Sequence, residues 1–79
     1  MTQTEDILYE LRRRGEDGLT PLEALRWFGC FRLAARIADA KERLDSDEYI
    51  VNVGAIIDGK KVAKYVLRER VRLQPELGL

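Results

Sequence analysis

The chain has 79 residues, with 14 basic and 14 acidic side chains, no histidine and a single cysteine, Cys30. This length fits one domain. A single cysteine cannot form an intrachain disulfide, and the chain has too few cysteine and histidine ligands for a usual zinc site. It also has no histidine to act as a general base. We therefore expect no metal, no cofactor, no small-molecule substrate and no enzymatic activity. The lack of about 18 consecutive apolar residues predicts a protein that does not span a membrane. The single cysteine fits a reducing interior, so we expect a location in the cytoplasm.

The first predicted helix covers about residues 4–14. Thr2 and Glu5, three residues apart, can exchange hydrogen bonds as a capping box at its start. Gly15 follows three arginines, which is typical of a helix end. Three apolar residues at helical spacing give the helix one face for the core: Ile7, Leu8 and Leu11.

A second, short helix is predicted over residues 21–28. Thr20 is a good N-cap, Pro21 suits the first helical position, and Glu23 can reach back to the cap. Trp27 is interpreted as a partly buried core residue, with a contact to the C-terminal tail or to a second copy as the alternative. We expect three apolar side chains of this helix in the core: Leu22, Leu25 and Phe28.

A tight turn containing Gly29 and Cys30 leads directly into a third helix, predicted over residues 32–44. Cys30 is interpreted as a small, buried apolar residue. The acidic run at residues 45–48 is interpreted as a solvated linker. Apolar residues recur in the third helix at intervals of four, three and four positions, which places them on one narrow face: Leu33, Ile37, Ala40 and Leu44.

The spacing of apolar residues changes in the second half of the chain. Residues 49–53 and 62–67 are rich in β-branched and aromatic side chains, and Asp58-Gly59 between them is a strong hairpin-turn signal. Gly54 is expected to mark a bulge or a bend. We therefore predict a two-stranded hairpin with Lys60 and Lys61 near its tip.

The order helix, helix, tight glycine turn, helix, hairpin predicts a mainly α fold with a β-hairpin: three helices plus a wing, the winged helix-turn-helix arrangement. In this arrangement the third helix enters the major groove of duplex DNA, and the hairpin touches the neighbouring backbone. We expect the domain to cover residues 1–68, with a C-terminal tail over residues 69–79.

The third helix carries a charged stripe beside its apolar face, at intervals of four, three and four residues: Arg32, Arg36, Asp39 and Arg43. We predict that Arg32, Ala35, Arg36 and Asp39 contact base edges. Arginine can donate two hydrogen bonds to guanine, and an alanine methyl can pack on a thymine methyl. The alternative is a solvated helix face on which Asp39 pairs with a neighbouring arginine.

Five further side chains are predicted to contact the DNA backbone: Thr20, Arg43, Lys60, Lys61 and Lys64. The three lysines lie at or near the hairpin tip, where a wing would meet phosphates. The alternative is an exposed turn whose lysines keep it soluble and protect a strand edge.

Two segments of the chain resemble a known family. The first runs from Thr20-Pro21-Leu22-Glu23-Ala24-Leu25 through Phe28-Gly29-Cys30 to Arg32-Leu33-Ala34-Ala35-Arg36-Ile37, and the second is the closing stretch 59–67. Both are similar to the short helix-turn-helix domain proteins of phages and prophages. The resemblance implies a winged-helix fold, DNA binding, and a regulatory or recombination-accessory role in a bacterial host. Residues 39–48 depart from it, since they are acidic where a basic helix end is expected.

Two functions stay open on this basis. The first is sequence-specific binding of double-stranded DNA, as a weak homodimer whose contact would use Trp27 and residues 71–79. The second is a winged-helix module that binds another protein, which the zero net charge and the exposed acids favour.

Overall fold

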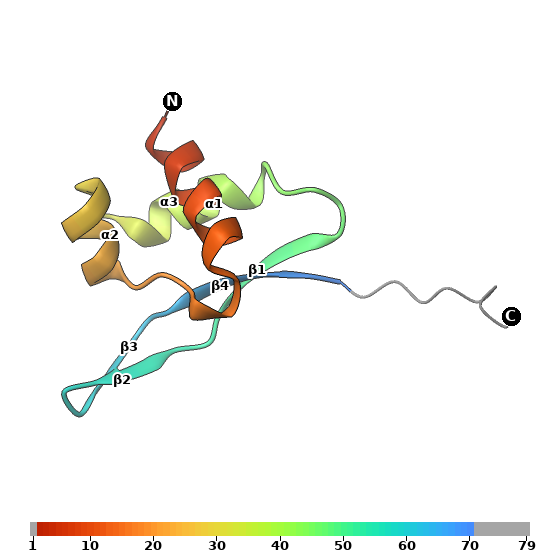
Figure 1. The fold of residues 1–79 in the computed structure, drawn as a ribbon. Helices are drawn as coiled ribbons and strands as arrows, with labels where there is room; N and C mark the ends of the chain where they lie inside the picture. The colour runs from red at the N-terminus through yellow and green to blue at the C-terminus, as the bar shows by residue number, and fades with distance from the viewer. Residues whose placement is uncertain (1, 71–79) are drawn as a thin grey trace, which may run out of the picture.

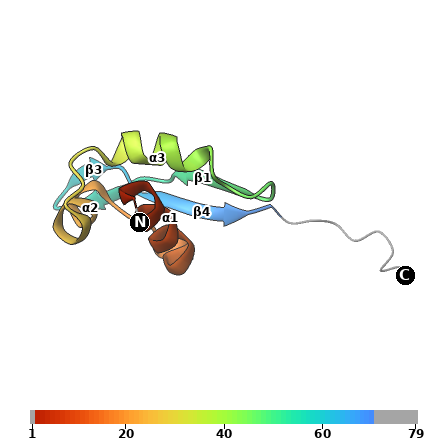
Figure 2. The same ribbon diagram turned by 90° about the horizontal axis from the view of Figure 1, so that it is seen from above.

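The computed structural model describes residues 2–70. Its elements are α1 (Gln3–Arg14), η1 (Gly15–Asp17), α2 (Pro21–Phe28), α3 (Leu33–Lys41), β1 (Glu48–Asn52), β2 (Ala55–Ile57), β3 (Lys60–Val62) and β4 (Tyr65–Glu69). The helices lie over the β1–β4 pair, and the β2–β3 hairpin, called the wing below, projects beyond them (Figure 1, Figure 2). The predicted fold class is confirmed. Most of the predicted tail over residues 69–79 lies outside the described residues, so the domain boundary stays a prediction.

Both predicted capping boxes are present. The Thr2 amide donates to Glu5 Oε1 at 2.8 Å, and the Glu5 amide donates to Thr2 Oγ1 at 3.2 Å. At α2, the Thr20 amide donates to Glu23 Oε1 at 3.1 Å, and the Glu23 amide donates to Thr20 Oγ1 at 3.3 Å. These bonds satisfy amides that the first turn of a helix leaves without partners. Both helices therefore begin within one residue of their predicted starts.

The third helix is shorter than predicted, because α3 ends at Lys41 and not at residue 44. The Glu42 amide donates to the Asp39 carbonyl at 3.2 Å, and the Arg43 amide donates to the Ala40 carbonyl at 2.9 Å. Such bonds between residues three apart tighten and close a helix end. Leu44 still packs, partly buried, against the core, so the apolar spacing continues beyond the helix itself.

The predicted hairpin is divided into two antiparallel pairs, β1 with β4 and β2 with β3. Gly54 lies at the break with a φ of 73°, and Asn52 Oδ1 accepts hydrogen bonds from the amides of Gly54 and Lys64, each at 3.1 Å. The bend predicted at Gly54 is confirmed. The turn predicted at Asp58-Gly59 is also confirmed, with φ values of 51° and 76° that suit a tight two-residue hairpin.

Two backbone hydrogen bonds attach the sheet to the helical part of the molecule. The Leu19 amide donates to the Tyr65 carbonyl, and the Tyr65 amide donates to the Leu19 carbonyl, both at 2.9 Å. Gly18 precedes this bridge with a φ of 67°, and a Cβ at Gly18 would lie 2.7 Å from the Tyr65 carbonyl oxygen. Glycine is therefore required there, both for its backbone angle and for the close approach.

The core lies between the helices and the β1–β4 pair. Its buried members are Ile7, Leu8, Leu11, Leu19, Ala24, Cys30, Leu33, Ile37, Ala40, Ile50 and Leu67, with Phe28, Leu44 and Tyr65 packed against them. The predictions for α1, for the apolar face of α3 and for Cys30 are confirmed. Leu19 is a core residue that the sequence analysis missed, because it follows a predicted loop and has no strand pattern around it.

The predicted core positions in α2 are wrong for two leucines. Leu22 is 58% exposed and Leu25 is 39% exposed. The helix turns the fully buried Ala24 inward instead, and Phe28, one turn later, packs partly buried beside it. A small side chain lets α2 approach its neighbours closely, so the larger leucines are left on the side that faces the wing.

Trp27 is also placed differently from the interpretation as a partly buried core residue. It is 55% exposed, and the guanidinium of Arg14 lies over its ring, 4.5 Å from the centroid. Trp27 thus covers a buried arginine of α1 and contributes no side chain to the apolar core.

We expect Ile37→Ala to lower the free energy of unfolding by about 2–5 kcal/mol, because it removes a buried side chain from a closely packed core. The control is Leu22→Ala, which truncates an exposed leucine and should cost less than about 1 kcal/mol. Urea unfolding followed by circular dichroism measures both changes. A loss below about 1 kcal/mol for Ile37→Ala would mean that α3 does not bury this face.

Candidate nucleic-acid interface

The charged stripe predicted on the third helix is present in α3. Arg32 precedes the first helical turn and is exposed, and Ala35 and Arg36 in that turn are partly exposed. Asp39 follows Arg36 by three residues, so the two lie on the same side of the helix, next to the buried face. The structure therefore brings together the residues predicted to contact bases.

Arg36 and Asp39 form an ion pair at 3.1 Å on this stripe, with side chains 36% and 51% exposed. Nε of Arg36 is shielded from solvent and has no hydrogen-bond partner among residues 2–70. An exposed pair three residues apart contributes only a few tenths of a kcal/mol. The pair therefore does not lock Arg36 in place, and an outside acceptor could compete for its guanidinium.

Arg43 lies just past the end of α3, where its guanidinium approaches Glu5 Oε2 of α1 at 3.7 Å. This contact joins the last residue of the stripe to the first turn of α1. Thr20 belongs to a different environment, because its hydroxyl caps α2 and only 8% of the residue is exposed. The structure thus separates Thr20 from the stripe.

The three predicted lysine contacts do not form one surface. Lys60 and Lys61 are neighbours in β3, so their side chains project to opposite faces of the wing. Lys60 faces α2, with Ile57 as its cross-strand partner, and Lys61 pairs with Ile56 on the other face. Lys64 lies at the base of the wing against Gly18. The alternation of side chains along a strand was the sequence signal that could have separated Lys60 from Lys61.

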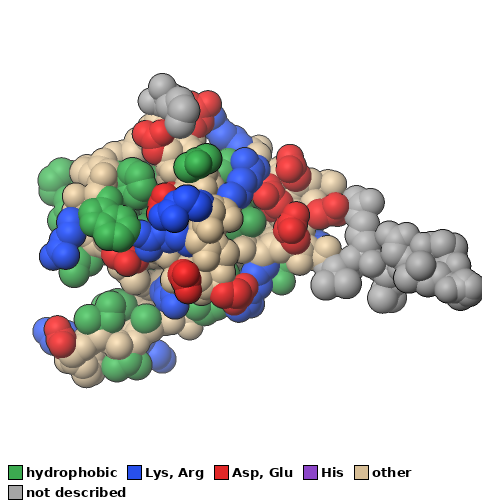
Figure 3. All heavy atoms as spheres, in the orientation of Figure 1, with side chains coloured by type: hydrophobic (Ala, Val, Ile, Leu, Met, Phe, Trp, Pro, Cys, Tyr) green, Lys and Arg blue, Asp and Glu red, His purple; other side chains and the backbone are tan. Residues whose placement is uncertain are grey.

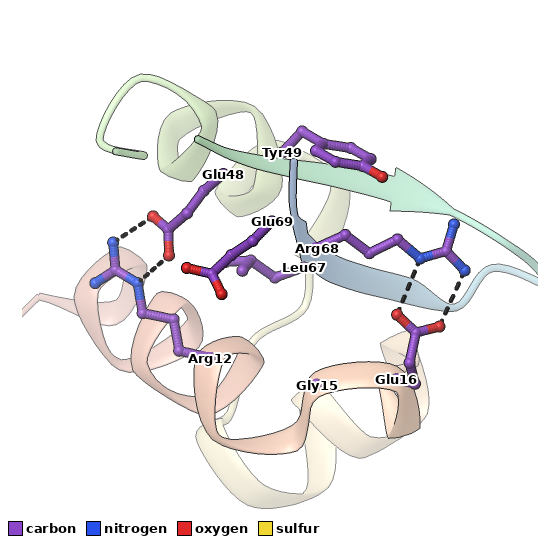
Figure 4. Close-up of a pocket in the computed structure, with 8 residues that line it drawn as sticks. All are labelled: Arg12, Gly15, Glu16, Glu48, Tyr49, Leu67, Arg68 and Glu69. Carbon is purple, nitrogen blue, oxygen red and sulfur yellow. Dashed lines mark hydrogen bonds and ion pairs between the residues drawn. The ribbon is translucent and has the colours of Figure 1, made fainter. Parts of the chain in front are cut away.

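The basic residues of α1 and β4 are held in ion pairs with glutamates. Nε and Nη2 of Arg12 donate to the two carboxylate oxygens of Glu48 at 2.9 and 2.8 Å. Arg68 pairs in the same two-bonded manner with Glu16, at 2.9 and 3.0 Å. Figure 4 shows both pairs across the polar cavity between α1, η1 and the β1–β4 end of the sheet.

Glu48 corrects the interpretation of residues 45–48 as a solvated linker. It is a buried residue, and its carboxylate also accepts a hydrogen bond from the Asp45 amide at 2.9 Å. The hydrogen bonds from Arg12, and to a lesser extent the one from the Asp45 amide, lower the pKa of Glu48 below its ordinary value. Arg12 and Glu48 lie 36 residues apart, so no local sequence pattern could have predicted the pair.

A second polar cluster joins α1 to α2. The carboxylate of Glu10 accepts hydrogen bonds from Arg13 and Arg14, which lower its pKa to about 2. Arg14 also donates to the Gly18 carbonyl at 3.0 Å and pairs with Glu23 at 3.1 Å. Within the described residues, these contacts use the arginines of α1 for the fold.

Some basic side chains outside α1 and β4 have no ion pair with a carboxylate among the described residues. Among residues 2–70, Arg32, Lys60 and Lys61 have no ion pair with a carboxylate, and they lie at the start of α3 and on the wing. Figure 3 shows acidic side chains spread over the body of the molecule, with one at the tip of the wing. Arg26 of α2, Lys41 at the end of α3, Lys64 at the base of the wing and Arg70 also have no ion pair among residues 2–70, so the unpaired cations include, but are not confined to, the start of α3 and the wing.

Within the part of the chain that the structure describes, no helix is long and apolar enough to cross a membrane. No group of three or more histidine, cysteine or acidic side chains within residues 2–70 could hold a metal ion.

A family model described as a winged helix-turn-helix domain matches residues 2–43, more than half of the chain. The matched part contains α1, α2 and α3 and ends before β1. Comparison with curated proteins and with solved structures gives no match.

We expect the stability that Glu10 contributes to depend on pH. Its folded pKa of about 2 lies below the ordinary value of 4.5, so its contribution is complete above that value and is lost as the pH falls toward 2. Glu10→Gln should lower the free energy of unfolding by about 2 kcal/mol at pH 7. The difference from the wild-type protein should shrink toward zero near pH 2.

Denaturant unfolding at a series of pH values measures this difference. The matched control is Asp17→Asn, because Asp17 is an exposed acid in η1 without an ion pair among residues 2–70. A Glu10→Gln curve that stays parallel to the wild-type curve down to pH 2 would show that the arginines do not stabilise the Glu10 carboxylate.

Proposed function

The chain belongs to the winged helix-turn-helix family, and we propose that it binds double-stranded DNA without catalysing a reaction. In this proposal α3 contacts bases in the major groove, and the wing contacts the neighbouring backbone. The role is that of a phage- or prophage-type transcriptional regulator or recombination accessory factor in the bacterial cytoplasm.

The observation that carries the proposal is the sorting of the cations. The arginines of α1 and β4 are neutralised by glutamates, while Arg32 and the wing lysines have no carboxylate partner within residues 2–70. Phosphates attract unpaired cations, whereas a cation already paired within the fold adds little. Arg32, Lys60 and Lys61 lie on the two elements with which winged helices approach DNA. Arg26 of α2 and Arg70 after β4 also lack an ion pair within residues 2–70, so the argument rests on the position of these three cations and not on their number.

We assign direct contacts with base edges to Arg32, Ala35, Arg36 and Asp39. Arg36 is suited to a contact with guanine through the two Nη atoms of its guanidinium, since its ion pair with Asp39 is exposed and weak. Asp39 could then accept a hydrogen bond from the amino group of cytosine. These contacts would decide which DNA sequence is preferred.

We assign backbone contacts to Thr20, Arg43, Lys60, Lys61 and Lys64. Because Lys60 and Lys61 project from opposite faces of the wing, a wing that enters a groove edge-on would present one lysine to each strand. Such contacts would position the protein without selecting a sequence. A weak homodimer on paired half-sites would add the specificity that one small domain lacks.

A second candidate function is a winged-helix module that binds another protein. The side of α3 away from both the buried face and the arginine stripe carries Ala34, Ala38 and, just past the helix end, Glu42, all exposed. A small and weakly acidic helix face is better suited to a protein surface than to phosphates. DNA binding and protein binding are separated by the experiment below.

We expect Arg36→Ala and Lys61→Ala to impair DNA binding in different ways. Arg36→Ala should reduce the free energy of binding to the preferred duplex by about 1–3 kcal/mol, because it removes a base contact. The loss of binding free energy on random duplex should be much smaller. Lys61→Ala should weaken binding to both duplexes equally, because it removes a phosphate contact. It should also reduce the slope of the logarithm of the binding constant against the logarithm of the salt concentration by about one unit.

The measurement is the affinity for a duplex selected from a random library, and for random duplex, over a salt series. Arg68→Ala is the control, since it also removes one positive charge but from an ion pair far from the wing. Equal losses on both duplexes for Arg36→Ala would mean that α3 does not read bases. If neither the wild-type protein nor the variants bind duplex at low salt, the protein-binding function replaces this proposal.

A further inference from the structure

An apolar cleft of about 500 Å³ separates α2 from the wing. Its walls come from both sides: Leu22 and Leu25 of α2, Phe31 of the turn before α3, and Ile57 and Val62 of the wing. Figure 3 shows hydrophobic side chains on both sides of the hollow between the wing and the body of the molecule. The cleft is separate from the arginine stripe of α3.

The cleft results from the way in which α2 and the wing are oriented. Leu22 and Leu25 are three residues apart, so they form one apolar ridge, which α2 leaves uncovered when it buries Ala24. On the wing, Ile57 is 41% exposed and pairs with Lys60 across the strands. Val62 lies two residues after Lys60 in β3, so Ile57, Lys60 and Val62 share one face of the wing. Leu22, Leu25, Ile57 and Val62 thus leave a contiguous apolar surface between α2 and the wing that a partner can cover.

Phe31 stands beside the cleft as a projecting side chain. It is 85% exposed, the largest exposure among the large hydrophobic residues of the described chain. A knob and a hollow on the same surface are the two halves of a self-complementary contact. In a dimer with a two-fold axis, each residue of one copy meets the partner residue of the other, so both hollows are filled at once.

Charge supports a second copy as the occupant. The formal net charge is zero, so two copies do not repel each other at long range. Asp58 and Lys60 both line the cleft near the wing tip, with opposite charges. Across a two-fold axis, Asp58 of each copy can face Lys60 of the other, which completes the complementarity of the apolar contact.

We propose that the cleft between α2 and the wing is a homodimer interface, in which Phe31 of each copy enters the cleft of the other. This contact uses neither Trp27 nor residues 71–79. It does not require DNA, because none of the stripe residues Arg32, Arg36, Asp39 and Arg43 lines the cleft. Lys60 and Thr20 do line the cleft, so DNA affinities should be measured at protein concentrations below those at which the dimer forms.

The test is analytical ultracentrifugation of the protein without DNA, in a concentration series up to about 1 mM, where weak association is populated. The wild-type protein should form dimers, and Phe31→Ala should weaken them about a hundredfold, because a tenfold contribution is lost from each of two copies. Tyr9→Ala is the control, since Tyr9 is another aromatic residue, 65% exposed, on α1 and outside the cleft. Circular dichroism checks that both variants are folded.

A second pair of variants tests the orientation of the contact. Lys60→Glu should weaken the dimer about tenfold or more, because it opposes Asp58 of the other copy with a like charge. Lys61→Glu makes the same change in net charge on the opposite face of the wing and should leave the dimer unchanged. A wild-type protein that stays monomeric overturns the proposal. The proposal is also overturned if Phe31→Ala and Tyr9→Ala change the dimer dissociation constant equally, or if Lys60→Glu and Lys61→Glu do.

Discussion

Two backbone hydrogen bonds between Leu19 and Tyr65 hold the helices and the sheet in their relative positions. They are the only strand-like pairing that the described residues make between the segment before α2 and the β-strands. Gly18 makes this approach feasible, since a side chain there would collide with the Tyr65 carbonyl. Tyr65 also begins β4, so the bridge fixes the base of the wing against the start of α2. The position of the wing relative to α2 and α3, and with it the cleft and the spacing of the unpaired cations, follows from this short connection.

The charges of the molecule are divided between the fold and its surface. Glu10, Glu16, Glu23 and Glu48 pair with arginines of α1 and β4, and these pairs tie α1 to α2 and to the sheet. Glu10 and Glu48 are buried and need such partners, because an unpaired charge away from water is costly. The pairs use cations and anions in equal measure, so the remaining charges of the chain also sum to zero. At the start of α3 and on the wing, Arg32, Lys60 and Lys61 are not neutralised by an ion pair among residues 2–70.

The apolar surface is divided in a similar way. In α1 and α3 the hydrophobic face is covered by the rest of the fold, whereas in α2 the ridge of Leu22 and Leu25 is left beside the wing. A domain of this size has few elements with which to cover every apolar face, since small chains bury a smaller share of their surface. The cost of the exposed ridge is removed if a second molecule covers it. The two proposals for this protein use the arginine stripe of α3 for base contacts and the cleft for self-association, and they share Thr20 and Lys60, which line the cleft and are also assigned to the DNA backbone.

The sequence by itself determined the local structure. The capping boxes at Thr2 and Thr20, the glycine turn before α3 and the Asp58-Gly59 hairpin turn involve residues close together in the chain, so their hydrogen bonds can be predicted from spacing alone. The stripe on α3 followed from helical periodicity for the same reason. Only the tertiary structure decided which face of α2 is buried, that Glu48 reaches Arg12, and that Leu19 joins the sheet, because each depends on residues distant in sequence. It also placed Lys60 against α2 and Phe31 in solvent. The spacing of residues along the chain specifies the helices, strands and turns. The packing of these elements decides which surfaces are exposed, and it depends on contacts between residues distant in sequence, which a short-range pattern cannot predict.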